Sequence, residues 1–126
     1  MHSAGVGWVK KADIGDQLSV LELLPETRPD EIYYPPACHQ SAEGMEFDRH
    51  DLLLRSFEVN TLALSHVISG ILKAGLQHRL FYAASSRVFG NADATVQNEQ
   101  TPFNPICPYG ISKTAGVHLL AFNGFL

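Results

Sequence analysis

Two stretches decide the fold of this chain: RLFYAASSRVFG at residues 79–90 and TPFNPICPYGISKTAG at residues 101–116. The first begins with a near-continuous apolar run, which is typical of a strand buried on both faces of a parallel sheet. The second leads through prolines to Pro108, a residue favoured at the first position of a helix, and predicts a helix over residues 109 to about 122. A buried strand followed by a helix indicates the α/β class.

The residues before these stretches also alternate between helix and strand signals. The segment DIGDQLSVLELLPETRPDE (13–31) predicts a helix that Asp16 caps and that Pro25 and Pro29 end. The segment EIYYPPA (31–37) predicts a short strand, because isoleucine and tyrosine favour strands and two prolines cannot continue a central ladder.

A long helix is predicted in the middle of the chain. Apolar residues recur at three- and four-residue steps from about Asp48 to Ala74, and Gly75 is placed to end the helix. Residues 90–108 are rich in proline and predict a long loop, a kind of segment that is more often functional than idle. Residues 1–12 are expected to form a disordered or irregular start, and residues 13–126 the folded part.

Only two convincing strands are present, and two strands alone do not make a stable open sheet. The alternation of strands and helices therefore predicts part of a doubly wound parallel sheet with flanking helices. Either the chain is a piece of a larger domain, or it takes further strands from a partner.

The composition argues against several kinds of partner. The formal charge of −4 disfavours a nucleic-acid or anionic-membrane surface, because both need a basic patch. No apolar run approaches the length of a membrane span. Cys38 and Cys107 are too few for a disulfide framework, so reduced thiols in a cytoplasmic protein are expected. Neither the cysteines nor the six histidines have ligand spacing, and no metal site is predicted.

Three residues of the two deciding stretches suggest one reaction site. Tyr109 and Lys113 are four residues apart on the predicted helix and share a face. A free tyrosine has a pKa of about 10 and is a poor base, but a nearby ammonium favours the phenolate, which can accept a proton from a hydroxyl that is losing hydride. Ser85 follows the strand and can hydrogen-bond the same hydroxyl, at the edge where open α/β sheets bind ligands.

Each of these residues also has an ordinary structural interpretation. A Tyr-x-x-x-Lys pair is a weak signal alone, because it arises readily by chance. A serine after a strand is most often a cap or turn residue. The order of the three residues, the position of Ser85 at a strand end and the prolines before Tyr109 together favour the reaction site.

The motifs resemble those of the extended short-chain dehydrogenases/reductases, in the NAD-dependent epimerase/dehydratase family, and are most similar to GDP-mannose 4,6-dehydratases. The stretch YAASSRVFG resembles the strand-end serine/threonine motif of that family, and QNEQTPFNPICPYGISK resembles its loop and Tyr-Lys helix. DIGD, DEIYYPPA and FEVNTLAL resemble further segments of the same family. The similarity spans roughly residues 13–120 and implies a partial Rossmann-like fold.

The resemblance implies a role for each matching residue of the reaction site. Tyr109 would be the general base for oxidation at sugar C4, and Ser85 would bond the C4 hydroxyl. Lys113 would tune Tyr109 and hold the nicotinamide ribose of NAD or NADP.

The resemblance also implies cofactor contacts outside the reaction site. Asp13 and Ile14 would flank the adenine, and Ala37 would line the cofactor through its backbone. Asn60 is a poor helix former in mid-helix. It is either a positioning residue or a tolerated polar residue that faces water or a backbone carbonyl.

Three departures from the family pattern change what is expected of this chain. The Gly-x-x-Gly-x-x-Gly turn that holds the cofactor pyrophosphate is absent, and so are the first βα units. The C-terminal substrate domain is expected to be missing as well. Arg87 replaces the glutamate that removes the C5 proton in the dehydratases, and it stays protonated, so it cannot be that base.

The expected function is therefore that of a fragment of an NAD(P)-dependent sugar-nucleotide dehydratase (a lyase) or epimerase, with a GDP-mannose-like nucleotide sugar as substrate. With Arg87 in place, oxidation or epimerisation is favoured over dehydration. The isolated chain is expected to bind NAD or NADP weakly or not at all, and to be inactive. The alternative is a catalytically dead remnant or interaction module that completes its sheet with a partner or by self-association through exposed edges.

Overall fold

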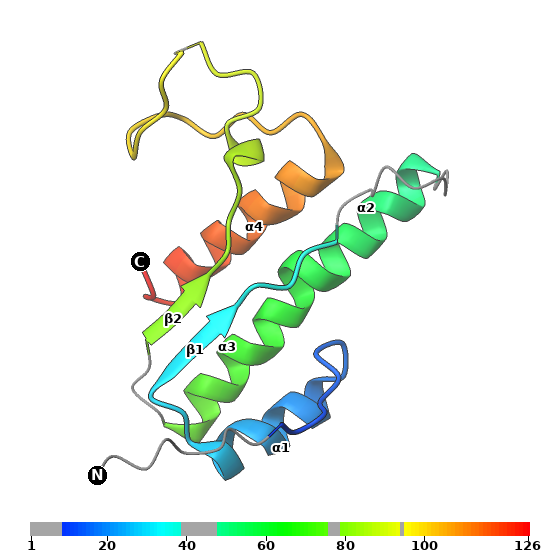
Figure 1. Cartoon of the computed structure of the whole chain (residues 1–126), viewed down its shortest axis with the longest axis vertical. Coiled ribbons are helices and arrows are strands. Elements are labelled where there is room, and N and C mark those ends of the chain that lie inside the picture. The colour runs from blue at the N-terminus through cyan, green and yellow to red at the C-terminus, as the bar shows by residue number, and fades with distance from the viewer. Residues whose placement is uncertain (1–8, 39–47, 76–78, 94) are drawn as a thin grey trace, which may run out of the picture.

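The computed structural model describes residues 9–38, 48–75, 79–93 and 95–126. The elements, in chain order, are α1 (Gln17–Thr27), β1 (Glu31–Tyr34), α2 (Arg49–Phe57), η1 (Glu58–Leu62), α3 (Ala63–Ala74), β2 (Arg79–Tyr82), η2 (Ser86–Val88) and α4 (Pro108–Phe122). β1 and β2 are parallel, with Glu31 opposite Arg79 and Tyr34 opposite Tyr82 (Figure 1). The predicted elements and the first helical position of Pro108 are confirmed. Of the expected irregular start, residues 1–8 lie outside the described ranges, and residues 9–12 form no helix or strand.

Helix α1 begins as predicted but ends later. The Asp16 side chain accepts a 3.2 Å hydrogen bond from the Leu18 N–H and caps the helix. The prediction that Pro25 ends the helix is wrong, because the helix continues for two residues beyond it. Near a helix end, proline removes only one backbone hydrogen-bond donor, and its fixed φ is compatible with a helix, so the helix can continue past it. Arg28 ends the helix in the left-handed conformation (φ 42°), with its N–H bonded to the Leu24 carbonyl.

The predicted long helix runs from the Asp48 cap to Gly75, but it is not α-helical throughout. Asp48 accepts a hydrogen bond from a backbone N–H of the first turn, and Gly75 ends α3 at φ 63°. Between α2 and α3 lies η1, a π turn in which the Ala63 N–H bonds to the Glu58 carbonyl, five residues back. The hydrophobic periodicity did not predict this turn.

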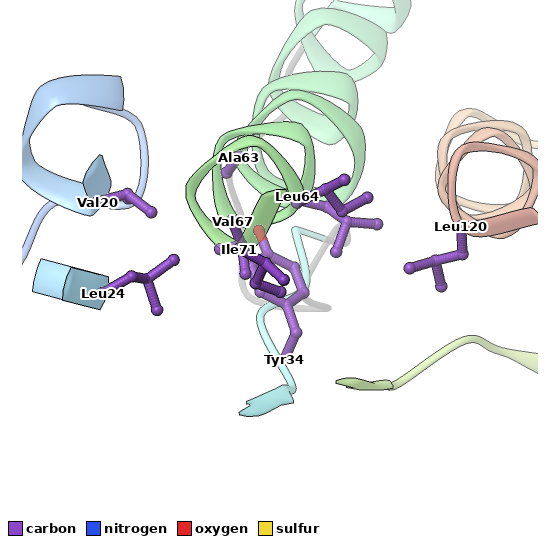
Figure 2. Close-up of a cluster of buried hydrophobic side chains, with 9 residues drawn as sticks. Val20, Leu24, Tyr34, Ala63, Leu64, Val67, Ile71 and Leu120 are labelled. Carbon is purple, nitrogen blue, oxygen red and sulfur yellow. The ribbon is translucent and has the colours of Figure 1, made fainter. Parts of the chain in front are cut away.

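The core lies between the strands and the helices. Figure 2 shows α1, α3 and α4 on one side of the two strands, with α3 in the middle. The buried cluster comprises Val20, Leu24, Tyr34, Ala63, Leu64, Val67, Ile68, Ile71 and Leu120. Most of these residues come from α3, whose apolar side packs against both flanking helices and the sheet.

The described helices leave the opposite face of the sheet uncovered. Tyr33 is 66% exposed and Phe81 is 58% exposed, and their rings pack against each other with centroids 5.8 Å apart. The prediction that the second strand is buried on both faces is therefore wrong. The apolar character of the sequence is that of a strand covered on both sides, but the described helices cover one side only.

Candidate functional site

Lys113 joins the carboxyl ends of the two strands. Its ammonium nitrogen Nζ donates a hydrogen bond of 2.7 Å to the Ala83 carbonyl, after β2, and one of 3.1 Å to the Pro36 carbonyl, after β1. The residue is 0% exposed, and Nζ lies 4.7 Å from the ring centroid of Tyr82. Burial removes water from the charged form and lowers the pKa of Lys113 below its ordinary value of 10.5.

Tyr109 lies one helical turn before Lys113 on α4. The Lys113 Nζ is 5.8 Å from the centroid of the Tyr109 ring, so the ring and the charge are neighbours, as their spacing predicts. The start of α4 comes close to η2, because a Cβ on Gly110 would lie 2.5 Å from the Arg87 carbonyl oxygen. The missing side chain of Gly110 therefore lets the first turn of α4, which carries Tyr109, approach the segment after β2.

Ser85 follows β2 and caps η2. Its Oγ accepts a 3.2 Å hydrogen bond from the Arg87 N–H, which is the ordinary structural role of a serine after a strand. This bond uses the hydroxyl oxygen as an acceptor and leaves its hydrogen available for a second bond. The cap and a ligand contact are therefore compatible.

Ser85 and Tyr109 line one pocket of about 510 Å³, which we call the strand-end pocket. Its described lining residues are Ala37, Leu52, Ser85, Ser86, Arg87, Cys107, Pro108 and Tyr109. They come from the segments that follow both strands, from α2 and from the start of α4. The pocket thus brings together Ser85, Tyr109, Ala37 and Arg87, and it lies at the edge where α/β sheets bind ligands.

Asn60 is a buried link between the segment after β1 and α4. It is 0% exposed. Its Oδ1 accepts a 3.1 Å hydrogen bond from the Cys38 N–H, and its Nδ2 donates to Ser112 Oγ at 2.9 Å and to the Cys38 carbonyl at 3.4 Å. The contact with a backbone carbonyl is one of the two interpretations that the sequence left open. The further bond to Ser112 gives Asn60 a role in holding two segments of the site together.

Two tyrosines hold the π turn against the sheet. The Tyr34 hydroxyl donates a 2.6 Å hydrogen bond to the Val59 carbonyl, and the Tyr82 hydroxyl donates a 3.1 Å bond to the Asn60 carbonyl. Tyr34 and Tyr82 are opposite each other in the sheet, and their rings stack with centroids 6.1 Å apart. Because a π turn disrupts the regular ladder, its carbonyls need other donors.

Sequence reasoning missed Tyr82 and Ser112 as parts of the site. A signal for Tyr82 was present, since both predicted strands, EIYY and RLFY, end in tyrosine. Ser112 carried no such signal, because its hydrogen-bond partner Asn60 is 52 residues away in the sequence.

Asp13 and Ile14 are not among the described residues that line the strand-end pocket. The Asp13 carboxylate accepts a 2.9 Å hydrogen bond from the Gly15 N–H in the turn before α1. Ile14 packs against the core, and its carbonyl oxygen is 3.0 Å from Nδ1 of His66. Their predicted contact with an adenine stays a prediction.

Cys38 and Cys107 are both free thiols. Within the described ranges, no three histidine, cysteine, aspartate or glutamate side chains gather in a way that could hold a metal ion. The described helices include none that is long and apolar enough to cross a membrane.

Comparison with known proteins identifies the family. The sequence profile of GDP-mannose 4,6 dehydratase matches residues 5–122. The chain belongs to the GDP-mannose 4,6 dehydratase family. The GDP-mannose 4,6 dehydratase of Drosophila melanogaster is 30% identical over 117 residues, which are 91% of this chain. The GDP-mannose 4,6-dehydratase of Sinorhizobium fredii strain HH103 is 35% identical over 103 residues, which are 80% of this chain. The matched part is 28% of the length of each of these dehydratases.

A solved structure of the wider group has the same fold. The UDP-glucose-4-epimerase of Stenotrophomonas maltophila, with bound NAD and formylated UDP-arabinopyranose, matches with a TM-score of 0.74 and 26% sequence identity. The match covers 90% of this chain and 32% of that epimerase. The predicted membership of the epimerase/dehydratase group and the predicted Rossmann-like fold are thus both confirmed for this member of the GDP-mannose 4,6 dehydratase family.

Proposed function

We propose that this chain carries the C4-oxidation site of an NAD(P)-dependent sugar-nucleotide dehydratase or epimerase. One observation carries the proposal: Ser85 and Tyr109 line the same strand-end pocket, with the Lys113 ammonium 5.8 Å from the Tyr109 ring. The GDP-mannose 4,6 dehydratases to which the chain is similar support a GDP-mannose-like nucleotide sugar as the substrate.

In this proposal each of the three residues has its own task. Tyr109 accepts the proton of the sugar C4 hydroxyl as that carbon is oxidised, and Ser85 donates a hydrogen bond to the same oxygen. Lys113 places its ammonium beside the Tyr109 ring. Lys113 acts mainly as a positioning residue, because its buried ammonium is bonded to the Pro36 and Ala83 carbonyls.

The described residues fit the nicotinamide end of NAD or NADP. The strand-end pocket has a size typical of small-molecule sites and offers the backbone of Ala37 and the hydroxyls of Ser85 and Tyr109. When bound, the nicotinamide supplies a hydride acceptor for the sugar carbon. The sequence contains no Gly-x-x-Gly-x-x-Gly turn for the pyrophosphate, so we expect weak binding by this chain.

Arg87 bears on which reaction follows the oxidation. Its guanidinium remains protonated in proteins and cannot take a proton from sugar C5. Because Arg87 lines the strand-end pocket, oxidation or epimerisation at C4 is favoured over loss of water.

The proposal can be tested by titrating NAD and NADP into the native chain while following backbone amide shifts by NMR. We expect millimolar binding, with shifts at Ser86, Arg87 and Gly110 around the strand-end pocket. Ser85→Ala and Tyr109→Phe, which each remove one hydroxyl, should weaken these shifts. Tyr33→Phe, which removes a hydroxyl from the uncovered sheet face, is the matched control and should leave them unchanged.

Two results would contradict the proposal. Shifts confined to residues outside the strand-end pocket would place the cofactor elsewhere. Equal binding by native chain and both hydroxyl variants would remove Ser85 and Tyr109 from the site. Micromolar affinity would instead show that the missing glycine motif is not needed, and would correct the expected strength of binding.

A second candidate function is that of an interaction module whose sheet is completed by another chain. The observations that favour it are that the sheet of the described residues has two strands and that Tyr33 and Phe81 on one of its faces are more than half exposed. Size-exclusion chromatography with light scattering tests this candidate. A dimer that Phe81→Glu converts to a monomer would support it, and a compact native monomer at all concentrations would count against it.

A further inference from the structure

The described lining of the strand-end pocket includes a single charged residue, Arg87. None of the eight described lining residues is an aspartate or glutamate. The whole chain has the opposite balance, with 13 acidic and 9 basic residues. The charged residue of the described lining therefore has the opposite sign to the net charge of the chain.

The Arg87 guanidinium is not neutralised within the described part of the chain. The ion pairs there join Lys10 to Glu26 and Arg79 to Glu31, and no described carboxylate pairs with Arg87. The backbone of Arg87 is fixed independently of its side chain, because Ser85 Oγ bonds its N–H and the backbone of Gly110 lies against its carbonyl. The residue is thus held at the pocket with its charge available.

From these contacts and charges we propose that the strand-end pocket is a subsite for an anionic group, with Arg87 as the residue that selects it. A guanidinium presents a planar fork of donors that matches a carboxylate or a phosphate, and Ser85, Ser86 and Tyr109 add hydroxyl donors around the same pocket. The group is either the carboxylate of a uronic acid or a phosphate of the nucleotide. The inference rests on the proposed function, since it assigns the charge of the ligand that Ser85 and Tyr109 contact.

The native chain can be titrated with D-glucuronate, D-glucose and inorganic phosphate, with backbone amide shifts of Ser86 and Arg87 as the readout. Glucuronate and glucose differ at C6, where one bears a carboxylate and the other a hydroxymethyl group. We expect glucuronate to bind and glucose to bind at least about tenfold more weakly, because a charge-assisted hydrogen bond is lost. A higher affinity for glucuronate than for phosphate assigns the subsite to a sugar carboxylate, and the reverse order assigns it to a nucleotide phosphate.

Arg87→Gln should weaken glucuronate binding about tenfold, and Arg87→Lys, which keeps the charge but not the planar fork, should weaken it less. Arg79→Gln is the matched control, because Arg79 is an exposed arginine at the start of β2. This variant should bind glucuronate with the affinity of the native chain. Thermal unfolding checks that each variant is folded. Equal affinities for glucuronate and glucose, or native affinity in Arg87→Gln, would overturn the proposal.

The anion subsite and the proposed function can fail separately. Tyr109→Phe removes the Tyr109 hydroxyl and leaves the Arg87 guanidinium in place, so this variant should still bind glucuronate. If glucuronate binds through Arg87 while NAD and NADP shift only amides outside the strand-end pocket, the proposed oxidation site fails and the anion subsite stands. If the nicotinamide cofactors bind there but glucuronate and phosphate do not, the subsite fails and the proposed function stands.

Discussion

The ammonium of Lys113 donates a 2.7 Å hydrogen bond to the carbonyl oxygen of Ala83. With its second bond, to the Pro36 carbonyl, this side chain ties together the ends of two strands that are otherwise joined through their ladder. A charge buried in this way is costly unless its donors are used, and here two carbonyls and an aromatic ring surround it.

Lys113→Met should lower the free energy of unfolding by about 3 kcal/mol, because two carbonyls lose their donor at about 1–3 kcal/mol each, while the cost of burying the charge is relieved. Urea unfolding measures the change. Lys73→Met, on an exposed position of α3, is the control and should change stability by less than about 0.5 kcal/mol. If Lys113→Met also changed the free energy of unfolding by less than about 0.5 kcal/mol, the two hydrogen bonds of Lys113 would contribute little to stability.

The lowered pKa of Lys113 predicts a pH dependence of stability. Between the folded-state pKa and the ordinary value of 10.5, the unfolded chain holds a proton that the folded chain has released. The free energy of unfolding contributed by Lys113 therefore rises with pH across this interval. The native chain should be more stable than Lys113→Met, and this difference in the free energy of unfolding should increase as the pH rises toward 10.5. A difference that stays constant would contradict the lowered pKa.

Asn60 and Ser112 should be energetically coupled. Their 2.9 Å hydrogen bond is buried, so a double-mutant cycle with Asn60→Ala and Ser112→Ala should give a coupling of about 1 kcal/mol. Asn60→Ala should cost more than Ser112→Ala, because it also removes the partner of the Cys38 N–H and one of the two donors to the Cys38 carbonyl. Gln100→Ala, at an exposed loop position, is the control. Strictly additive losses would mean that the bond does not stabilise the fold.

Gly116→Ala should destabilise the protein, although alanine is normally the better helix former by about 1 kcal/mol. A Cβ on Gly116 would lie 2.4 Å from the Tyr82 hydroxyl oxygen and 3.0 Å from the Asn60 carbonyl oxygen. Thermal unfolding should show a lower melting temperature, and adding Tyr82→Phe should restore part of the loss by removing the closest atom. A stabilised Gly116→Ala variant would show that α4 can move away from the sheet.

Tyr34→Phe should make the protein less sensitive to alkali. Burial raises the pKa of Tyr34 from 10.0 to about 12, so between these values the folded chain keeps a phenol proton that the unfolded chain has lost. The free energy of unfolding therefore falls as the pH rises through this window, by about 2 kcal/mol from this residue. Tyr34→Phe should lose about 1 kcal/mol at neutral pH, with its bond to Val59, but show a shallower alkaline decline. An unchanged decline would argue against the raised pKa.

Of the described residues that line the strand-end pocket, the sequence singled out Ala37, Ser85, Arg87 and Tyr109, but not their detailed contacts. Ser85, Tyr109 and Lys113 could be chosen because strand ends and helix spacing are local patterns. The bonds of Lys113 to Pro36 and Ala83 could not, because they depend on how three separate segments meet. For Ser85, the sequence offered a cap and a ligand contact as alternatives, and the structure shows that the cap does not consume the hydroxyl hydrogen.

The errors in the fold prediction also have physical causes. Pro25 was taken as the end of α1 because proline disrupts helix interiors, but near a terminus that penalty is small. The exposure of Phe81 was missed because an apolar strand sequence indicates that the strand favours burial. It does not show whether other elements cover both faces of the sheet. The π turn was missed because the tyrosine hydroxyls that stabilise it come from strands remote in sequence.

The π turn also sets the rotational phase between the two halves of the long helix. Each residue of an α-helix advances the rotation by about 100°, and the π turn fits one extra residue into a turn, so converting Glu58–Leu62 to regular α-helix with all its residues kept would rotate α2 by roughly that angle relative to α3. Leu52, which forms one wall of the strand-end pocket, would then turn away from it, while α3 kept its place in the core. A long helix made α-helical throughout in this way would therefore keep the fold and lose the shape of the pocket.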